Sequence, residues 1–129
     1  MRVFITKLFD RRRRNDVTDK NLISTVKEME QGTIHANLGG GLTKQRVARD
    51  GAGKSGGFRT LIAYREGERA IFLHIFAKND IGNISEKQKE DFRKLAKNLL
   101  KFSDDEIQRA IENKELKEIV HEKTKQISK

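Results

Sequence analysis

The sequence has no cysteine, no proline and no tryptophan among its 129 residues. The absence of cysteine excludes disulfides and thiolate metal sites, and the absence of proline argues against long rigid linkers. No apolar run approaches the roughly 20 residues of a membrane helix. Charge also interrupts the N-terminal stretch MRVFITKLFD too early for a secretory signal. We therefore expect a cytoplasmic protein without a membrane segment, with one domain over residues 1–120 and a polar, frayed tail at 121–129.

What the sequence has in excess is positive charge, with a formal net charge of +9. Residues 1–78 carry 16 Lys or Arg against 8 Asp or Glu, whereas residues 79–129 carry 12 against 11. A basic front with a balanced rear indicates a surface that faces a polyanion, and nucleic acid is the commonest such partner. A basic surface that only keeps the protein soluble is the alternative.

Apolar periodicity and turn residues predict a succession of short strands and helices. Ser85 with Gln88 and Ser103 with Glu106 form capping-box patterns that begin helices, and the turn 66–68 joins two strands into a hairpin. The predicted strands cover residues 3–5, 42–49, 58–65, 69–77 and part of 114–120, and residues 33–42 are predicted as loop. The first predicted helix lies within residues 7–16, with Leu8 and Phe9 turned inward, and the second runs from Thr18 to about Gln31. A third helix follows Ser85, with Phe92, Leu95, Ala96 and Leu99 at helical spacing. A fourth follows Ser103.

Residues 43–59, TKQRVARDGAGKSGGFR, hold five cations, one acid and four glycines. Glycine lets a backbone bend sharply and lie close to a partner, so this stretch is interpreted as a flexible basic loop between strands that binds phosphate. A second basic run, Arg11 to Arg14, sweeps around its predicted helix. Some of these arginines must therefore face solvent, as contacts for a partner or for RNA.

The segment Gly53–Lys54–Ser55 looks like the end of a P-loop, but two requirements are missing. The motif needs a glycine where Ala48 stands, and it needs a helix after the Lys-Ser pair. Here a predicted strand follows, so the pattern argues against a nucleotide-hydrolysing P-loop. The three histidines also lack the paired spacing of a metal site, and no G-x-S-x-G pattern supports a catalytic triad. His74 is interpreted as a half-buried sheet residue.

If the three central strands are neighbours, Arg46, Arg59 and Lys78 converge on one side of the sheet near the glycine loop. Arginines stay charged and would stabilise a pentacoordinate phosphate. A lysine among other cations loses its proton more readily and would serve as a base. The alternative is that these cations bind a nucleic-acid backbone without chemistry.

Residues 39–80, GGGLTKQRVARDGAGKSGGFRTLIAYREGERAIFLHIFAKND, resemble the RelE/ParE toxin superfamily of bacterial type II toxin–antitoxin systems, in its HigB-like, phage-associated branch. The resemblance implies an α+β fold in which N-terminal and C-terminal helices pack on one face of a small antiparallel sheet. It also implies a toxin that inhibits translation by ribosome-dependent, metal-independent cleavage of mRNA, in which the RNA 2′-OH attacks the adjacent phosphate. The implied partners are mRNA, the ribosome and a cognate helix-turn-helix antitoxin, and no cofactor is implied.

The family roles are carried over residue by residue. Arg59 matches the phosphate-binding arginine of the family, and Lys78 matches the lysine after the last strand. Arg46 and Lys54 match its basic strand and loop, where a lysine or arginine serves as base or charge stabiliser. The expected site is completed by a set of RNA-binding cations, namely Lys44, Arg49, Arg11, Arg12, Arg13 and Arg14.

The sequence departs from the family pattern at two places. Asn79 stands where some members have an arginine as the proposed general acid, and the C-terminal tyrosine that some members stack on a base is missing. Some relatives inhibit DNA gyrase without cleaving RNA, so the superfamily fold leaves that function open. A plain RNA-binding module is the third alternative, although aromatic side chains for base stacking are few.

Overall fold

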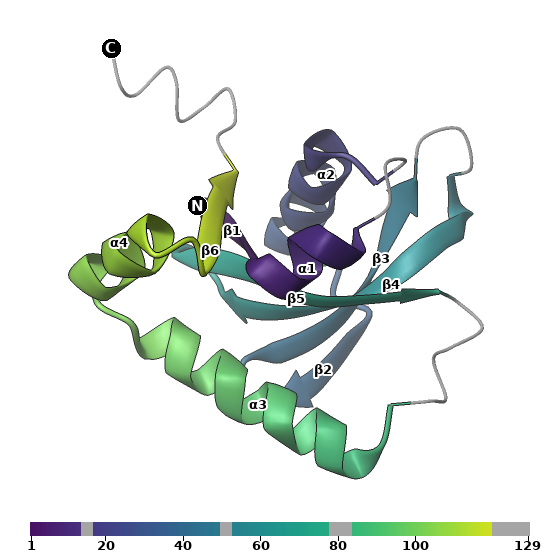
Figure 1. Cartoon of the computed structure of the whole chain (residues 1–129). Helices are drawn as coiled ribbons and strands as arrows, with labels where there is room; N and C mark the ends of the chain where they lie inside the picture. Colours follow the sequence, from purple (N-terminus) through teal and green to yellow (C-terminus); the bar gives the residue numbers. More distant parts are fainter. Residues whose placement is uncertain (14–16, 50–52, 78–83, 120–129) are drawn as a thin grey trace.

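The computed structural model describes residues 1–13, 17–49, 53–77 and 84–119, and it shows one six-stranded sheet with helices on both sides (Figure 1). The strands are β1 (Arg2–Thr6), β2 (Ala36–Gly39), β3 (Leu42–Arg49), β4 (Gly53–Arg65), β5 (Arg69–Ala77) and β6 (Leu116–Ile119). The helices are α1 (Lys7–Arg12), α2 (Asp19–Glu30), α3 (Glu86–Lys101) and α4 (Asp104–Glu112). The predicted α+β class is confirmed. None of the described helices is long and apolar enough to cross a membrane.

The strands lie in the order β2-β3-β4-β5-β1-β6. Neighbouring strands are antiparallel except β1 and β5, which pair in parallel. The expected antiparallel sheet therefore contains one parallel pair. On its other side β1 pairs with β6, so residues from the two ends of the domain meet at one edge of the sheet.

Helices cover both faces of the sheet, which corrects the expectation that they pack on one face. On one face, α1 and α2 form a core in which the rings of Phe9 and Phe72 lie 5.3 Å apart, together with Leu22. On the other face, α3 and α4 form a second core that contains Leu61. Its neighbour Ile62 belongs to the first core, because successive residues of a strand point to opposite faces.

A β-bulge in β5 interrupts this alternation. Phe72 lies in the α1–α2 core and Leu73 in the α3–α4 core. The register then shifts, so that His74 pairs with Leu61 and its ring contacts Phe92 of α3. Leu73 and His74 thus both face α3, because a bulge places an extra residue on one strand. A strict period of two would have placed His74 on the same face as Phe72, and that is wrong here.

The helix starts agree with the sequence signals. Thr18, Ser85 and Ser103 are N-caps, and each takes part in a complete capping box. Gly32 follows the C-cap of α2 with a φ of +99°, a conformation that favours glycine. The β4–β5 hairpin is also confirmed, with Gly67 at φ +78° in its turn.

The segment predicted as loop at residues 33–42 contains β2, which is a correction. The buried side-chain amide of Gln45 on β3 fixes the segment that leads into β2. The amide accepts a hydrogen bond from the His35 N–H at 3.1 Å and donates one to the Thr33 carbonyl at 2.8 Å. Local propensity does not predict this strand, since Ala36–Gly39 has no β-branched residue. Contacts with β3 create it.

The predicted flexible glycine loop is shorter than expected, because β4 begins at Gly53 and pairs there with Arg49. The backbones approach closely at Gly57, where a Cβ atom would overlap the carbonyl oxygen of Val47. Glycine at this position therefore permits strand pairing across a bulge. Strand structure on both sides of Lys54 also agrees with the sequence argument against a P-loop.

Two leucines expected in the core are exposed. Leu8 is 44% exposed and Leu95 is 40% exposed. On α1 the neighbouring Phe9 is the residue that enters the core, and on α3 the buried residues include Ala96 and Leu99. Each helix presents a narrower apolar face than the sequence spacing predicts.

Candidate functional site

The register of β3, β4 and β5 brings their side chains into two adjacent rows on the face that α3 covers. Arg46 lies directly opposite Arg59, and Arg59 lies opposite Phe76. In the next row, Leu61 has neighbours on both adjoining strands. We call the six residues of these two rows the cationic face: Arg46, Arg59, Phe76, Lys44, Leu61 and His74. The pairing of Arg46 with Arg59 agrees with the convergence predicted from strand alternation.

Arg59 is the most unusual member of the cationic face, because its charged side chain is buried. Only 8% of the residue is exposed, and its Nη1 atom is buried without a hydrogen-bond partner. Burial lowers the pKa of the Arg59 guanidinium from its ordinary value, and the positive charge of Arg46 lowers it further. An arginine pKa starts so high that the group stays charged at neutral pH.

A buried charge without a partner is expensive, because several kcal/mol of hydration are lost per ion without compensation (roughly, in folded proteins). Within the described part of the chain, no carboxylate forms an ion pair with Arg46 or Arg59. The two arginines are instead paired residues of adjacent strands, and the charge of Arg46 acts on Arg59. This arrangement favours an external anion that would bind both groups.

His74 adds a titratable group to the same face. Its ring stacks on Phe76 with centroids 5.6 Å apart and contacts Phe92 at 5.1 Å. Its Nδ1 atom is buried without a hydrogen-bond partner. Burial lowers the pKa of His74 from its ordinary value, and the positive charge of Arg12 on α1 lowers it further. Both effects favour the neutral imidazole at pH 7.

A small pocket opens over the cationic face, with a volume of about 60 Å³. Leu61, Phe76 and Lys44 contribute to its walls from the sheet, and Lys89 contributes from α3. The volume corresponds to about two water molecules in the liquid, which is too small to enclose a nucleobase. An anionic chain would therefore bind across this face and insert only a small group.

A family model described as the RelE toxin of the RelE/RelB toxin-antitoxin system matches residues 1–119. This chain belongs to the RelE toxin family. No curated protein matches it. The family membership makes the chain a toxin of a toxin–antitoxin system and implies a RelB-like antitoxin as its partner.

The structure brings together three of the predicted site residues of this RelE toxin, namely Lys44, Arg46 and Arg59. Arg49 and Lys54 belong to β3 and β4, but their side chains are outside the described part of the structure, as are Arg14 and Lys78 altogether. These four residues remain sequence predictions.

The three described arginines of the run, Arg11, Arg12 and Arg13, lie in three different environments. Arg12 lies near enough to His74 to influence its titration. Arg13 forms ion pairs with Asp10, at 3.0 Å, and with Asp19, so its charge is already compensated. Arg11 lines a separate pocket beside β6. The three arginines therefore have different surroundings, and the partner or RNA contact expected of the run stays a prediction.

The sequence interpretation of His74 as a half-buried sheet residue is confirmed, but its place on the cationic face against Phe92 was missed. The bulge in β5 is what turns His74 toward α3, and no local signal marks it. Among the described residues, no group of three histidine, cysteine, aspartate or glutamate side chains lies close enough together to hold a metal ion.

Proposed function

We propose that this RelE toxin is a ribosome-dependent mRNA endoribonuclease of the HigB-like branch, acting in the cytoplasm. The observation that supports this best is the buried, unpaired guanidinium of Arg59 beside Arg46. Two adjacent cations that form no ion pair with a carboxylate of the described residues suit the phosphate of an RNA backbone, whose charge increases in the transition state of cleavage.

In the proposed reaction, the RNA 2′-oxygen attacks the adjacent phosphorus and the bond from phosphorus to the 5′-oxygen breaks. The products are a 2′,3′-cyclic phosphate and a 5′-hydroxyl. A base takes the proton of the 2′-OH, and an acid returns a proton to the leaving 5′-oxygen. Arg59 and Arg46 bind the non-bridging oxygens and stabilise the pentacoordinate phosphorus.

His74 is the proposed proton acceptor among the described residues. It lies one row from Arg59 on the cationic face, and its lowered pKa leaves a neutral imidazole at pH 7. The guanidinium groups cannot take this role, because they keep their protons. Lys54 and Lys78 retain their proposed roles near the scissile phosphate on the family resemblance alone.

The decisive experiment combines the purified toxin with translating ribosomes and maps new 5′ ends on the mRNA. We expect cleavage within the ribosome-bound codons and 5′-hydroxyl ends. The same mRNA without ribosomes should stay intact. Intact mRNA in both samples, together with an SOS response in cells that express the toxin, would contradict the proposal and favour gyrase inhibition. RNA that is bound but uncut would favour a plain binding module.

A further inference from the structure

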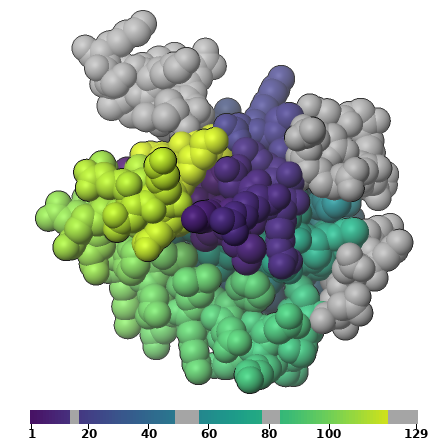
Figure 2. Space-filling view, in the orientation of Figure 1, coloured from purple at the N-terminus to yellow at the C-terminus, as the bar shows by residue number. Residues whose placement is uncertain are grey.

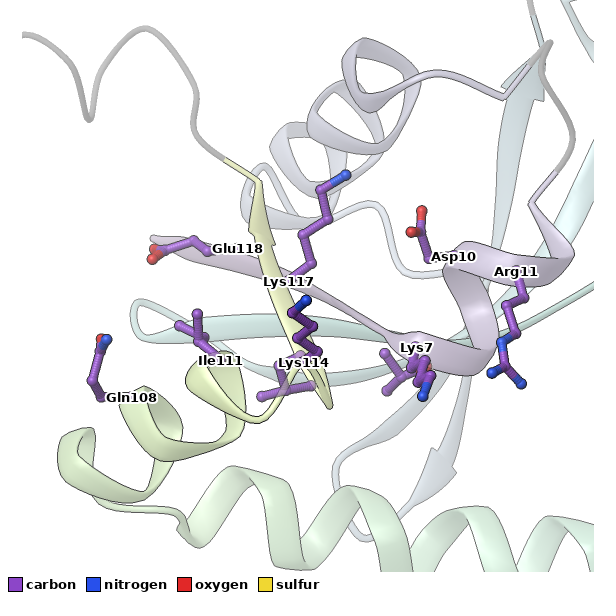
Figure 3. A pocket seen from close by; sticks show the side chains of 10 residues that line it. Lys7, Asp10, Arg11, Gln108, Ile111, Lys114, Lys117 and Glu118 are labelled. Carbon is purple, nitrogen blue, oxygen red and sulfur yellow. The ribbon is translucent and has the colours of Figure 1, made fainter.

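A cavity of about 660 Å³ lies between α1, the end of α4 and β6 (Figure 3). We call it the α1–α4 pocket. It shares no lining residue with the cationic face. In Figure 2 the yellow surface of α4 and β6 borders the purple surface of α1 at this place. The pocket exists because β1 and β6 pair, with Thr6 opposite Leu116, so that α1 and α4 are brought to the same edge of the sheet.

Four cations line the α1–α4 pocket: Lys7 and Arg11 from α1, Lys114 after α4, and Lys117 from β6. None of them forms an ion pair with a carboxylate of the described residues. Figure 3 shows that they come from α1 on one side and from β6 with the end of α4 on the other. The pocket is thus surrounded by positive charge from segments more than 100 residues apart in the chain.

The two acids in the lining do not neutralise this charge, because each already has an arginine partner outside the pocket. Asp10 binds Arg13 at 3.0 Å, and Glu118 binds Arg2 at 2.9 Å. Their charges are compensated by these arginines, and the four lining cations remain available to a ligand.

Lys114 adopts a backbone conformation that lysine rarely takes. It has a φ of 62°, the only positive φ of a non-glycine residue in the described chain. Its N–H donates to the Ile111 carbonyl at 3.0 Å, and the Glu115 N–H donates to the Ala110 carbonyl at 2.8 Å. These bonds form a Schellman motif, in which glycine is the usual residue at the Lys114 position. The rim of the pocket thus carries a lysine at a position where glycine would be easier to accommodate.

The pocket also has an apolar part. Leu116 is buried, and Ile111 is partly buried against the α3–α4 core. None of the lining residues is aromatic. A ligand that matches this surface carries several negative charges around an apolar side chain. Single-stranded RNA matches it poorly, since its bases bind best on aromatic platforms.

We propose that the α1–α4 pocket docks an acidic segment of the cognate antitoxin, with carboxylates on Lys7, Lys114 and Lys117 and an apolar side chain over Ile111. The proposal relies on the toxin assignment only to name the partner. A segment docked there contacts α1 and β6 and leaves the cationic face unoccupied, because the two sites share no lining residue.

The test uses the antitoxin identified as the product of the adjacent gene that abolishes growth arrest, tiled as short labelled peptides. Binding to the full toxin chain is measured by fluorescence anisotropy. We expect one acidic peptide with a central apolar residue to bind, and its glutamine-for-glutamate version to lose binding. An RNA oligonucleotide of equal charge should not compete at the pocket. Competition by RNA, or no peptide whose binding depends on the pocket, would overturn the proposal.

Three variants locate the contact. Lys114→Gly and Lys117→Gln should each weaken peptide binding by about threefold to tenfold. The melting temperature of the Lys114→Gly variant should rise at the same time, so its loss of binding would not be due to unfolding. Lys97→Gln removes the same charge from an exposed site on α3 and should leave binding unchanged. Equal losses in all three variants would mean attraction by net charge only and would contradict docking.

Cleavage of ribosome-bound mRNA separates this proposal from the proposed function. The pocket variants should cleave like the unchanged toxin, whereas a variant without the Arg59 charge should lose cleavage and still bind the peptide. Failure of the pocket proposal therefore leaves the cleavage result untouched, and failure of cleavage leaves the peptide result untouched.

Discussion

The cationic face and the α1–α4 pocket are both positively charged, but they hold their charge in opposite ways. The cationic face fixes Arg59 inside the sheet, 8% exposed and without a partner for Nη1. The pocket instead carries exposed lysines, such as Lys7 and Lys117, on its rim. A rigid guanidinium suits one phosphate in one orientation, whereas flexible lysines adapt to carboxylates on a peptide. This difference is the ground on which we propose chemistry at the first region and docking at the second.

The substitution Arg59→Met tests the cationic face most strongly, because it keeps an unbranched side chain, although a shorter one, and removes the charge. We expect ribosome-dependent cleavage to fall by about a hundredfold or more, because a transition-state contact is lost. The free energy of unfolding should rise by ~1–2 kcal/mol, because an unpaired buried charge is replaced by an apolar group. Single-turnover cleavage and urea unfolding measure the two effects.

Arg65→Met is the matched control, since Arg65 lies on the same strand but is exposed and paired with Glu68 at 3.3 Å. It should change cleavage and stability little. A destabilised Arg59→Met protein would show that Arg59 has a stabilising partner, and the assignment of an anion site would then fail.

Gly57→Ala tests the backbone that positions Arg59. Its Cβ would overlap the Val47 carbonyl oxygen, and that backbone atom cannot rotate away. We expect a loss of about 2–3 kcal/mol in the free energy of unfolding and reduced cleavage, while peptide binding at the α1–α4 pocket persists in the folded fraction. Urea unfolding followed by circular dichroism measures the loss.

Gly67→Ala is the graded control for this variant. Gly67 has a φ of +78°, but a Cβ added there would have no atom within 4 Å, so only the backbone conformation is penalised, by about 1 kcal/mol. Equal losses in the two variants would show that the close approach at Gly57 is unimportant.

The sequence predicted those parts of the molecule that depend on local chemistry. The caps at Thr18, Ser85 and Ser103 and the turn at Gly67 each need only a few neighbouring residues. The meeting of Arg46 with Arg59 followed from strand alternation and an assumed neighbour relation. These predictions succeeded because the relevant forces act within one element or between two adjacent ones.

The remainder depended on tertiary register, which local patterns do not contain. The bulge at Leu73 and His74 reverses the face of His74, and β2 exists only through its contacts with β3. The α1–α4 pocket requires β1 to pair with both β5 and β6. Its cations, among them Lys7 and Lys114, therefore could not be associated from the sequence.

The pH dependence of cleavage tests the role of His74. The pKa of the folded His74 lies below its ordinary value of 6.5, so a base at this position is neutral above that pKa and is lost as the pH falls through it. Cleavage should therefore decline on the acidic side, and His74→Gln should lower the plateau and remove this titration. An unchanged acidic limb in His74→Gln would assign the proton transfer to another group.

The free energy of unfolding should also depend on the protonation of His74, with a smaller change than the change in cleavage. Because the folded pKa is lowered, the unfolded chain binds a proton at His74 before the folded chain does as the pH falls. The neutral ring of His74 makes its full contribution to the free energy of unfolding above pH 6.5. This contribution declines as the pH falls below 6.5 and stops changing once the pH is below the folded pKa. The groups around the ring are Phe76 on its own strand, Phe92 from α3 and Arg12 from α1, and His74→Gln should remove the difference.

The smallest expected effect concerns the backbone at the rim of the α1–α4 pocket. Lys114→Gly should raise the free energy of unfolding by about 0.5–1 kcal/mol, because glycine takes a φ of 62° without steric penalty. The preceding residue supplies the control, since Asn113 has an ordinary φ of −81°. Asn113→Gly relieves no backbone strain and increases the conformational entropy of the unfolded chain, so the free energy of unfolding should fall. Opposite signs from two adjacent glycine substitutions, measured by thermal unfolding, would locate the strain at Lys114. Equal signs would remove the strain argument and leave the lysine without a reason to be preferred over glycine at this position.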